Sequence, residues 1–237
     1  MLAGGQGSRL RGVLPEGTPK VLAPVADKPF LWWLLHQLHQ QGIRRVALAL
    51  GYGAAMVREC LATESWPADL AIDSVVEPGP LGTGGALRFA FRHTKSDPIL
   101  LVNGDTLTDV DYGELVACHV RNHATVTMAL AKVPDASRYG LVEYSANGVV
   151  TGFREKEQGI MRPGPINAGV YCVSRQWVSH IPVEKPLSLE RDVLPFMIGQ
   201  GFFACLAAHR FIDIGTPSSL RAAGEFVAQT VGAGHDH

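Results

Sequence analysis

A glycine-rich turn and basic residues near the N-terminus form the first candidate for anion binding. The run L-A-G-G-Q-G-S-R-L at residues 2–10 leaves a short apolar stretch and enters the turn. Glycines let backbone N–H groups approach phosphate oxygens, and the Arg9 guanidinium can bind a phosphate through two parallel hydrogen bonds. Lys20, in the run T-P-K at residues 18–20, is a compact cation suited to the same ligand. The turn alone also fits a plain strand-to-helix connection, and its spacing differs from the phosphate loop G-x-x-x-x-G-K-[ST].

Two separated carboxylates follow apolar runs that are typical of strands. Asp105 comes after Ile99–Val102, and Asp213 comes after the pair Phe211-Ile212. A carboxylate at the carboxyl end of a parallel strand faces the ligand crevice of an open α/β sheet. Two carboxylates that meet at a triphosphate make the kind of site that Mg²⁺ prefers, with water and phosphate oxygens as its other ligands.

A D-x-D pattern at residues 109–111 is a second candidate for metal binding. Asp111 stands directly before the predicted helix Tyr112–Asn122, where an aspartate side chain caps the first turn. Capping is therefore favoured over metal binding for Asp111. Glu190 and Asp192, at the start of a later predicted helix, either cap that helix or reach a ligand, and both interpretations stay open.

The elements that must position these residues are predicted from residues 1–125, where apolar runs alternate with amphipathic stretches. The alternation predicts βαβ units, a parallel sheet, right-handed crossovers and helices on both faces. The predicted strands are Val46–Leu50, Leu70–Val76 and Ile99–Val102, and the predicted helices are Pro29–Gln41, Ala54–Thr63, Gly85–Arg92 and Tyr112–Asn122. Residues 1–3 alone remain for a first strand, so either that strand is truncated or the reading start lies upstream.

The second half, residues 126–237, has a more antiparallel pattern. Asn147-Gly148 predicts a hairpin, and Thr216-Pro217 predicts the start of a last helix. The hairpin strands are Leu141–Tyr144 and Val149–Phe153, followed by a strand at Ile166–Val173, a helix at Ser188–Ile198 and a strand within Phe202–Ile212. No linker separates the halves, so we expect a single domain over residues 1–237, with a nucleotide-binding half at 1–125 and a smaller half at 126–237.

Composition excludes several classes of protein. The 237 residues carry 21 Lys and Arg against 22 Asp and Glu, which excludes a strongly basic nucleic-acid binder and offers no attraction to anionic membranes. The 46% of hydrophobic residues excludes a mainly disordered chain, and no window approaches the length of about 18 apolar residues needed for a transmembrane helix. The 4 cysteines lack C-x-x-C spacing, so we expect free thiols and a cytoplasmic location.

A series of motifs, taken together, resembles the nucleotidyltransferase family that activates sugar 1-phosphates. The motifs appear in the family's order and run from Gly4 to Pro217, nearly the whole chain. They are G-G-x-G-S-R-L at 4–10, P-K at 19–20, K-P-F at 28–30, L-G-T-G-G-A at 81–86, N-G-D at 103–105, F-R-E-K at 153–156, N-A-G-V-Y at 167–171 and D-I-G-T-P at 213–217. Within the family, the stretch E-P-x-x-L-G-T-G-G-A at 77–86 and the short chain are most similar to the D-glycero-α-D-manno-heptose-1-phosphate guanylyltransferases.

The resemblance implies a fold and a set of site residues. The fold is a Rossmann-like mixed, mainly parallel sheet with helices on both faces and a smaller, β-rich, sugar-binding lobe. The implied catalytic residues are Arg9, Lys20 and Asp105, and Asp105 and Asp213 are the implied Mg²⁺ ligands. The implied nucleotide-binding residues are Leu2, Ala3, Gly4, Gly5, Gly7, Ser8, Glu77, Gly82, Thr83 and Gly84. The implied sugar-phosphate-binding residues are Asn103, Gly140, Glu155, Lys156, Asn167 and Gly169.

The choice of nucleobase rests on one carboxylate. Glu77 precedes the glycines at 82–85, which would let the backbone approach a base. A carboxylate can accept hydrogen bonds from N1–H and N2–H₂ of guanine together, whereas thymine offers a single donor of this kind. The sequence therefore favours GTP.

The resemblance implies transfer of a nucleotidyl group from an NTP to a sugar 1-phosphate, with release of pyrophosphate. The favoured pair is GTP and D-glycero-α-D-manno-heptose 1-phosphate, for surface polysaccharide synthesis. Mannose 1-phosphate with GTP and glucose 1-phosphate with dTTP are the alternatives, and the oligomeric state stays open, with a homodimer as one option. An inactive nucleotide-sugar-binding regulatory protein is disfavoured because Arg9, Lys20, Asp105, Lys156 and Asp213 are all present. A D-x-D glycosyltransferase is disfavoured by the glycine turn and Lys20.

Overall fold

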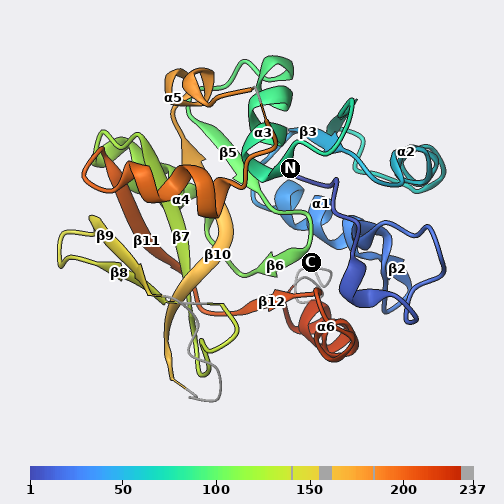
Figure 1. Cartoon of the computed structure of the whole chain (residues 1–237). Helices are drawn as coiled ribbons and strands as arrows, with labels where there is room; N and C mark the ends of the chain where they lie inside the picture. Colours follow the sequence, from blue (N-terminus) through green and yellow to red (C-terminus); the bar gives the residue numbers. More distant parts are fainter. Residues whose placement is uncertain (140, 155–161, 184, 231–237) are drawn as a thin grey trace. The chain divides into compact units, whose positions relative to one another are not determined.

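The computed structural model describes residues 1–139, 141–154, 162–183 and 185–230 (Figure 1). The chain divides into two compact units that interleave along the sequence. Unit 1 comprises Met1–Pro80, Asn103–Leu107 and Ile212–His237, and unit 2 comprises Leu81–Val102 and Thr108–Phe211. These units differ from the sequence halves 1–125 and 126–237, because unit 1 takes segments from both halves. The single-domain organisation stays a prediction.

Unit 1 contains the glycine turn and a pair of parallel strands. Leu2 bridges Ala49 on one side and Asn103 on the other, both in parallel, so the start of the chain lies between two strand ends. The elements are η1 (Ser8–Leu10), η2 (Lys20–Leu22), β1 (Pro24–Val25), β2 (Lys28–Pro29), α1 (Phe30–Gln40), β3 (Arg45–Leu50), α2 (Ala54–Thr63), β4 (Ala71–Val76) and α6 (Pro217–Thr230). Strand β3 pairs with β4 in parallel, as predicted.

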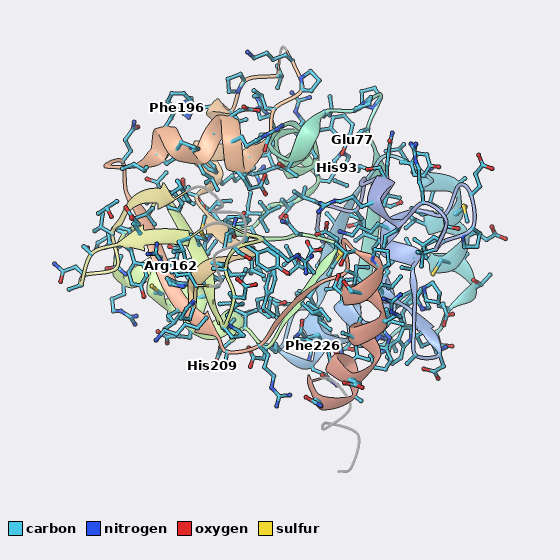
Figure 2. The ribbon with its side chains drawn as sticks, turned by 60° about the horizontal axis from the view of Figure 1, so that its bottom comes forward. Glu77, His93, Arg162, Phe196, His209 and Phe226 are labelled. Carbon is cyan, nitrogen blue, oxygen red and sulfur yellow. The ribbon has the colours of Figure 1, made fainter. Side chains whose placement is uncertain are left out.

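Helix α1 forms because its apolar residues recur at helical spacing. Phe30, Leu34 and Leu38 lie on one face and are buried. Pro29 directly precedes the helix, and Gly42 follows it with a φ of 86°, which glycine adopts without steric cost. The helix packs into a core that also includes residues of α6, on which Phe226 lies (Figure 2).

Unit 2 is built on a mixed sheet with the strand order β11-β7-β10-β5, which Figure 1 shows side by side. Strand β10 runs antiparallel to β5 and β7, and β11 runs parallel to β7. The elements are α3 (Gly82–Ala90), η3 (Phe91–His93), β5 (Ile99–Val102), α4 (Tyr112–Arg121), β7 (Val126–Val133), β8 (Leu141–Tyr144), β9 (Val150–Arg154), β10 (Gly164–Val173), α5 (Arg175–His180), η4 (Leu189–Val193), η5 (Leu194–Met197) and β11 (Phe202–Ala208). The remaining strands, β6 (Thr106–Thr108) and β12 (Phe211–Asp213), pair with each other.

Strand β10 carries a pronounced bulge. Asn167 lies opposite Leu130 of β7, but Tyr171 already lies opposite Met128, so the register shifts between them. Gly169, inside the bulge, has a φ of 71° that a side chain would strain. Bulges bend a strand and re-aim its side chains, which is why they are common beside functional sites.

Two predicted elements differ from the structure. The segment Ser188–Ile198, predicted as one helix, forms a π-helical turn, η4, followed by a 3₁₀ turn, η5. Pro195 lies at the start of η5 and has no N–H for a continuing helical hydrogen bond. The helix predicted at Gly85–Arg92 begins at Gly82 instead, so the glycine-rich residues 82–85 form the first turn of α3.

Two negative findings apply to the part of the chain that the structure describes. Within it, no helix is both long and apolar enough to cross a membrane. The 4 cysteines, all of them described, are free thiols as predicted; Cys60 is half-buried and the others are buried.

Candidate active site

A cluster of charged groups in unit 1 joins residues from three distant parts of the sequence. The Lys20 Nζ lies 2.7 Å from the Asp105 Oδ2 and 3.7 Å from the Asp213 Oδ1. Lys20 is only 7% exposed, whereas the side chains of Asp105 and Asp213 are 39% and 24% exposed. A buried ammonium group requires a charged partner, and the two carboxylates provide it. The structure therefore brings together Lys20, Asp105 and Asp213, as the motifs predicted.

Backbone contacts hold the two aspartates in place. The Gly104 N donates to the Leu2 carbonyl at 2.8 Å, and a Cβ at this position would lie 2.5 Å from the same oxygen, so only glycine fits before Asp105. The Ile214 N donates to the Asp105 carbonyl at 3.0 Å, which ties the two carboxylate-bearing segments together. The Asp213 Oδ1 also accepts a hydrogen bond from the Gly215 N.

The glycine turn lies against the charged cluster. Gly7 has a φ of 61°, and a Cβ there would lie 3.2 Å from the Lys20 Cβ. Arg9 follows in η1 with an exposed side chain. A cavity of about 580 Å³ lies beside the turn, and its lining consists of Tyr52 and the residues from Gln6 to Thr18 other than Ser8, Arg9 and Val13. This volume is in the range of small-molecule sites.

Glu77 lies beside the same turn. It follows β4, its backbone N donates to the Leu50 carbonyl at 2.8 Å, and the residue is half-buried (Figure 2). A Cβ on Gly4 would lie 3.4 Å from the Glu77 Oε1, so the carboxylate borders the glycine turn. The nucleotide-binding roles of Gly4 and Glu77 stay predictions.

The two carboxylates fit a small divalent cation. They converge on a single positive charge, the Lys20 ammonium, and offer the hard oxygen donors that Mg²⁺ takes. Among the described residues, no group of three or more His, Cys, Asp or Glu side chains is placed to bind a metal. An ion held by Asp105 and Asp213 would therefore need ligands from outside the protein, such as phosphate oxygens and water.

The D-x-D pattern is structural. Asp111 caps α4, with its Oδ1 accepting from the Glu114 N at 2.9 Å, as predicted. The Asp109 Oδ1 accepts from the backbone N of His209 at 2.7 Å and of Arg210 at 2.8 Å. Both carboxylates are engaged by backbone N–H groups.

Asn103 contributes an unsatisfied acceptor. It immediately precedes Gly104 and Asp105, and its Oδ1 is buried without a hydrogen-bond partner among the described residues. A buried polar atom of this kind is unfavourable until a donor reaches it. The atom agrees with the predicted binding role of Asn103, which stays a prediction.

In unit 2, the glycines of the L-G-T-G-G-A motif have a packing role. The Gly84 N donates to the Leu187 carbonyl at 2.9 Å, and a Cβ at Gly82 would collide with that carbonyl. Close approach of the segment around Leu187 thus explains these glycines without a ligand. Their predicted contact with a nucleobase stays a prediction.

Polar side chains next to this motif form a network that the sequence did not predict as a unit. The Glu190 carboxylate accepts from the Thr83 Oγ1 at 2.8 Å and from the Tyr171 hydroxyl at 3.4 Å. The Asn167 Nδ2 donates to the Tyr171 hydroxyl at 2.6 Å, and the Asn167 Oδ1 accepts from the Gly169 N at 2.9 Å. Thr83, Asn167 and Gly169 were predicted site residues. Tyr171 was missed as a partner, although it stands in the same N-A-G-V-Y motif.

Three predicted sugar-phosphate residues, Gly140, Glu155 and Lys156, lie outside the described residues.

Comparisons with known proteins agree with the fold and with the family that the motifs resemble. The chain matches the model of the family described as Nucleotidyl transferase over residues 1–230. It is 35% identical over 224 residues to D-glycero-alpha-D-manno-heptose 1-phosphate guanylyltransferase of Aneurinibacillus thermoaerophilus, covering 94% of this chain and 95% of that protein. It is 34% identical over 223 residues to mannose-1-phosphate guanylyltransferase of Mycobacterium tuberculosis, covering 93% of this chain but 61% of that protein.

A solved structure supports the same assignment. HddC from Yersinia pseudotuberculosis superposes with a TM-score of 0.83 at 32% identity, covering 95% of this chain and 96% of that chain. A second crystal structure of HddC, complexed with GMP-PN, matches equally well. The predicted α/β architecture is confirmed by this likeness. The protein is therefore an enzyme of the Nucleotidyl transferase family, and the resemblance to sugar-1-phosphate nucleotidylyltransferases seen in its motifs is confirmed.

Proposed function

We propose that this enzyme transfers GMP from GTP to D-glycero-α-D-manno-heptose 1-phosphate, with Mg²⁺ as its cofactor and pyrophosphate as its second product. The observation that carries the proposal is the Lys20, Asp105 and Asp213 cluster beside the glycine turn. The heptose-1-phosphate guanylyltransferase named above supports it, because the match covers nearly the full length of both proteins. The GMP-PN complex of HddC supports a guanine nucleotide as ligand.

The chemistry requires positioning and charge neutralisation rather than a protein nucleophile. A phosphate oxygen of the sugar 1-phosphate attacks the α-phosphorus of GTP in line. The bond from the α-phosphorus to the oxygen bridging to the β-phosphate breaks, and pyrophosphate leaves with that electron pair. Lys20 and Arg9 would stabilise the charge on the triphosphate and the leaving group.

Residue roles at the metal follow from the donor set. Asp105 and Asp213 would hold Mg²⁺, which, when bound, supplies positive charge to the phosphate oxygens. The Lys20 ammonium, which lies beside both carboxylates, would then turn to the phosphates. Loss of either carboxylate therefore disturbs both the metal ligands and the position of Lys20.

Substrate recognition is assigned to two groups of residues. Glu77, bordering Gly4, would accept hydrogen bonds from guanine. Glu155 and Lys156 would hold the sugar hydroxyls and the sugar phosphate, in keeping with the family motif. Asn103, Gly140, Asn167 and Gly169 complete the proposed sugar-phosphate side.

The proposal includes a cellular setting. A cytoplasmic enzyme would find GTP in supply, and its GDP-heptose product would serve surface polysaccharide synthesis. The free thiols agree with a reducing compartment.

A substrate panel tests the proposal. Pyrophosphate release is measured for GTP, dTTP, UTP and CTP, each with heptose, mannose and glucose 1-phosphates, with and without Mg²⁺. We expect the highest kcat/KM for GTP with heptose 1-phosphate and no turnover when EDTA removes the metal. Preference for mannose 1-phosphate would correct the sugar, preference for dTTP would correct the base, and no pyrophosphate with any pair would refute the proposal.

A further inference from the structure

The Glu190 carboxylate in unit 2 accepts hydrogen bonds from hydroxyl groups on separate segments of the chain. Its Oε2 accepts from the Thr83 Oγ1 at 2.8 Å, at the start of α3, and from the Ser188 Oγ at 3.2 Å. Its Oε1 accepts from the Tyr171 hydroxyl of β10 at 3.4 Å. The proposed reaction gives this carboxylate no role.

Capping does not account for Glu190. The adjacent turn η4 is capped by Ser188, whose Oγ accepts from the Arg191 N at 3.3 Å. The Asp192 Oδ2 in turn accepts from the Ser188 N at 2.7 Å, which completes the cap. Of the two acidic residues in this turn, Asp192 serves the turn itself, and Glu190 reaches outward to α3 and β10.

A chain of hydrogen bonds connects Glu190 to the bulge in β10. Tyr171 is fully buried, and its hydroxyl accepts from the Asn167 Nδ2 at 2.6 Å. The single hydroxyl proton is then donated to Glu190. Because the Asn167 Oδ1 accepts from the Gly169 N at 2.9 Å, the amide of Asn167 is fixed at both ends. The chain of bonds therefore runs from Glu190 through Tyr171 to the bulge.

A second arm ties Glu190 to the first turn of α3. The Thr83 hydroxyl donates its proton to Glu190 and accepts from the Leu189 N at 2.7 Å. One carboxylate thus holds a residue of the L-G-T-G-G-A motif and, through Tyr171, a residue of the N-A-G-V-Y motif.

We infer that Glu190 is a positioning residue that sets, with one carboxylate, both the first turn of α3 and the bulge of β10. The inference rests on the proposed function for its consequence, because that function assigns Asn167 to the sugar phosphate and the family motifs predict Thr83 as a nucleotide-binding residue. Loss of the carboxylate loosens both segments at once, whereas loss of one hydroxyl loosens one of them.

Hydrogen exchange of the free enzyme tests the positioning without substrate. Glu190→Ala should speed amide exchange about tenfold in residues 82–86 and 166–171, since each segment loses one hydrogen bond of the usual net strength. Glu190→Gln keeps the shape but offers one acceptor oxygen, so it should loosen one arm more than the other. Asp192→Asn is the matched control and should affect residues 188–193 alone. Unchanged exchange in both distant segments of Glu190→Ala would overturn the inference.

Kinetics test the two arms separately. Tyr171→Phe should raise the KM for the sugar 1-phosphate about fivefold, Thr83→Val should raise the KM for GTP about fivefold, and Glu190→Ala should raise both.

The double variant Glu190→Ala with Tyr171→Phe should show no higher KM for the sugar 1-phosphate than Glu190→Ala alone, because both changes break the same chain of hydrogen bonds. If the two substitutions instead raised the KM for the sugar 1-phosphate independently, so that their factors multiplied in the double variant, the inference would be overturned. A wild type inactive on every substrate pair would refute the proposed function but leave the exchange result standing.

Discussion

The charged cluster of unit 1 and the Glu190 network of unit 2 use carboxylates in different ways. In unit 1, Asp105 and Asp213 face a buried ammonium group, so the interaction is between full charges. In unit 2, Glu190 faces hydroxyl groups, so it fixes geometry without a cation. In the charged cluster, a second cation can replace the ammonium group as the partner of the carboxylates. In the Glu190 network, the hydroxyl groups are part of the chain, so their hydrogen bonds to the carboxylate are either formed or broken. The first arrangement suits the reacting phosphates, and the second suits the segments that place a substrate.

The largest effect is expected from the charges. Asp105→Asn and Asp213→Asn should each lower kcat at least about 100-fold at saturating Mg²⁺, because each removes a proposed metal ligand and a partner of Lys20. Asp111→Asn is the matched control, since asparagine caps a helix about as well as aspartate. Steady-state kinetics and thermal unfolding of the three variants separate chemistry from folding. If Asp105→Asn and Asp213→Asn both kept the wild-type kcat, the two carboxylates would have no role in the reaction.

Arg9 extends the comparison to an exposed charge of the glycine turn. Arg9→Ala should lower kcat by about tenfold to 100-fold and change the KM for GTP less, if the guanidinium acts mainly on charge that develops in the transition state. Arg9→Lys should recover part of kcat, because the charge returns without the planar pair of donors. A change confined to KM would make Arg9 a uniform binder of ground state and transition state.

Glu77 is a unit 1 carboxylate that is proposed to accept hydrogen bonds from uncharged donors, the N–H groups of guanine. Glu77→Gln keeps one acceptor, so the preference for GTP over dTTP should shrink by about tenfold to 100-fold rather than vanish. The measurement is kcat/KM for GTP, dTTP, UTP and CTP on wild type and variant. A GTP preference that the substitution leaves untouched would move the base contact to other groups of the site.

The smallest effect concerns the stability of unit 2. His119 is 5% exposed, its Nδ1 lies 3.0 Å from the Thr127 Oγ1, and burial lowers its pKa below the usual value of 6.5. The unfolded chain therefore binds a proton that the folded chain does not, so the stabilisation is complete above about pH 6.5 and is lost as pH falls toward the folded pKa.

Urea unfolding at pH 7.5 and 5.5 measures this loss. The free energy of unfolding should fall more in the wild type than in His119→Gln between these two pH values. His93→Gln, a change at an exposed histidine of unit 2 (Figure 2), is the control and should follow the wild type. Equal losses in wild type and His119→Gln would show that other groups carry the acid sensitivity.

Local patterns were sufficient for the elements with clear periodicity and boundaries. Helix α1 and strand β3 lie within about one residue of their predictions, because the apolar spacing of α1 and the flanking glycines mark them. The charged cluster was also predictable, since each of Lys20, Asp105 and Asp213 stands in a motif with a known order.

Other features depend on tertiary contacts that a linear pattern does not contain. Strand β7 was missed because V-T-M-A-L-A is buried on both faces and has neither alternation nor a β-branched majority. The Glu190 network was missed as a unit because Thr83 and Glu190 are far apart in sequence, and polar residues before a helix usually indicate a cap. The role of Gly82 and Gly84 was incompletely predicted, because the backbone that packs on them comes from the segment around Leu187.

The interleaving of the two units has a consequence for how the chain can be made and divided. Two further segments of unit 1 follow Pro80 in the sequence, Asn103–Leu107 and the segment from Ile212 onward, and each contributes one aspartate of the charged cluster. A fragment that ends at residue 102 contains Lys20 and the glycine turn but neither carboxylate, and a fragment that begins at residue 103 contains both carboxylates but no Lys20. During synthesis on the ribosome, Lys20 therefore emerges long before Asp213, and the three charged side chains of the cluster are all present only after residue 213 has been translated.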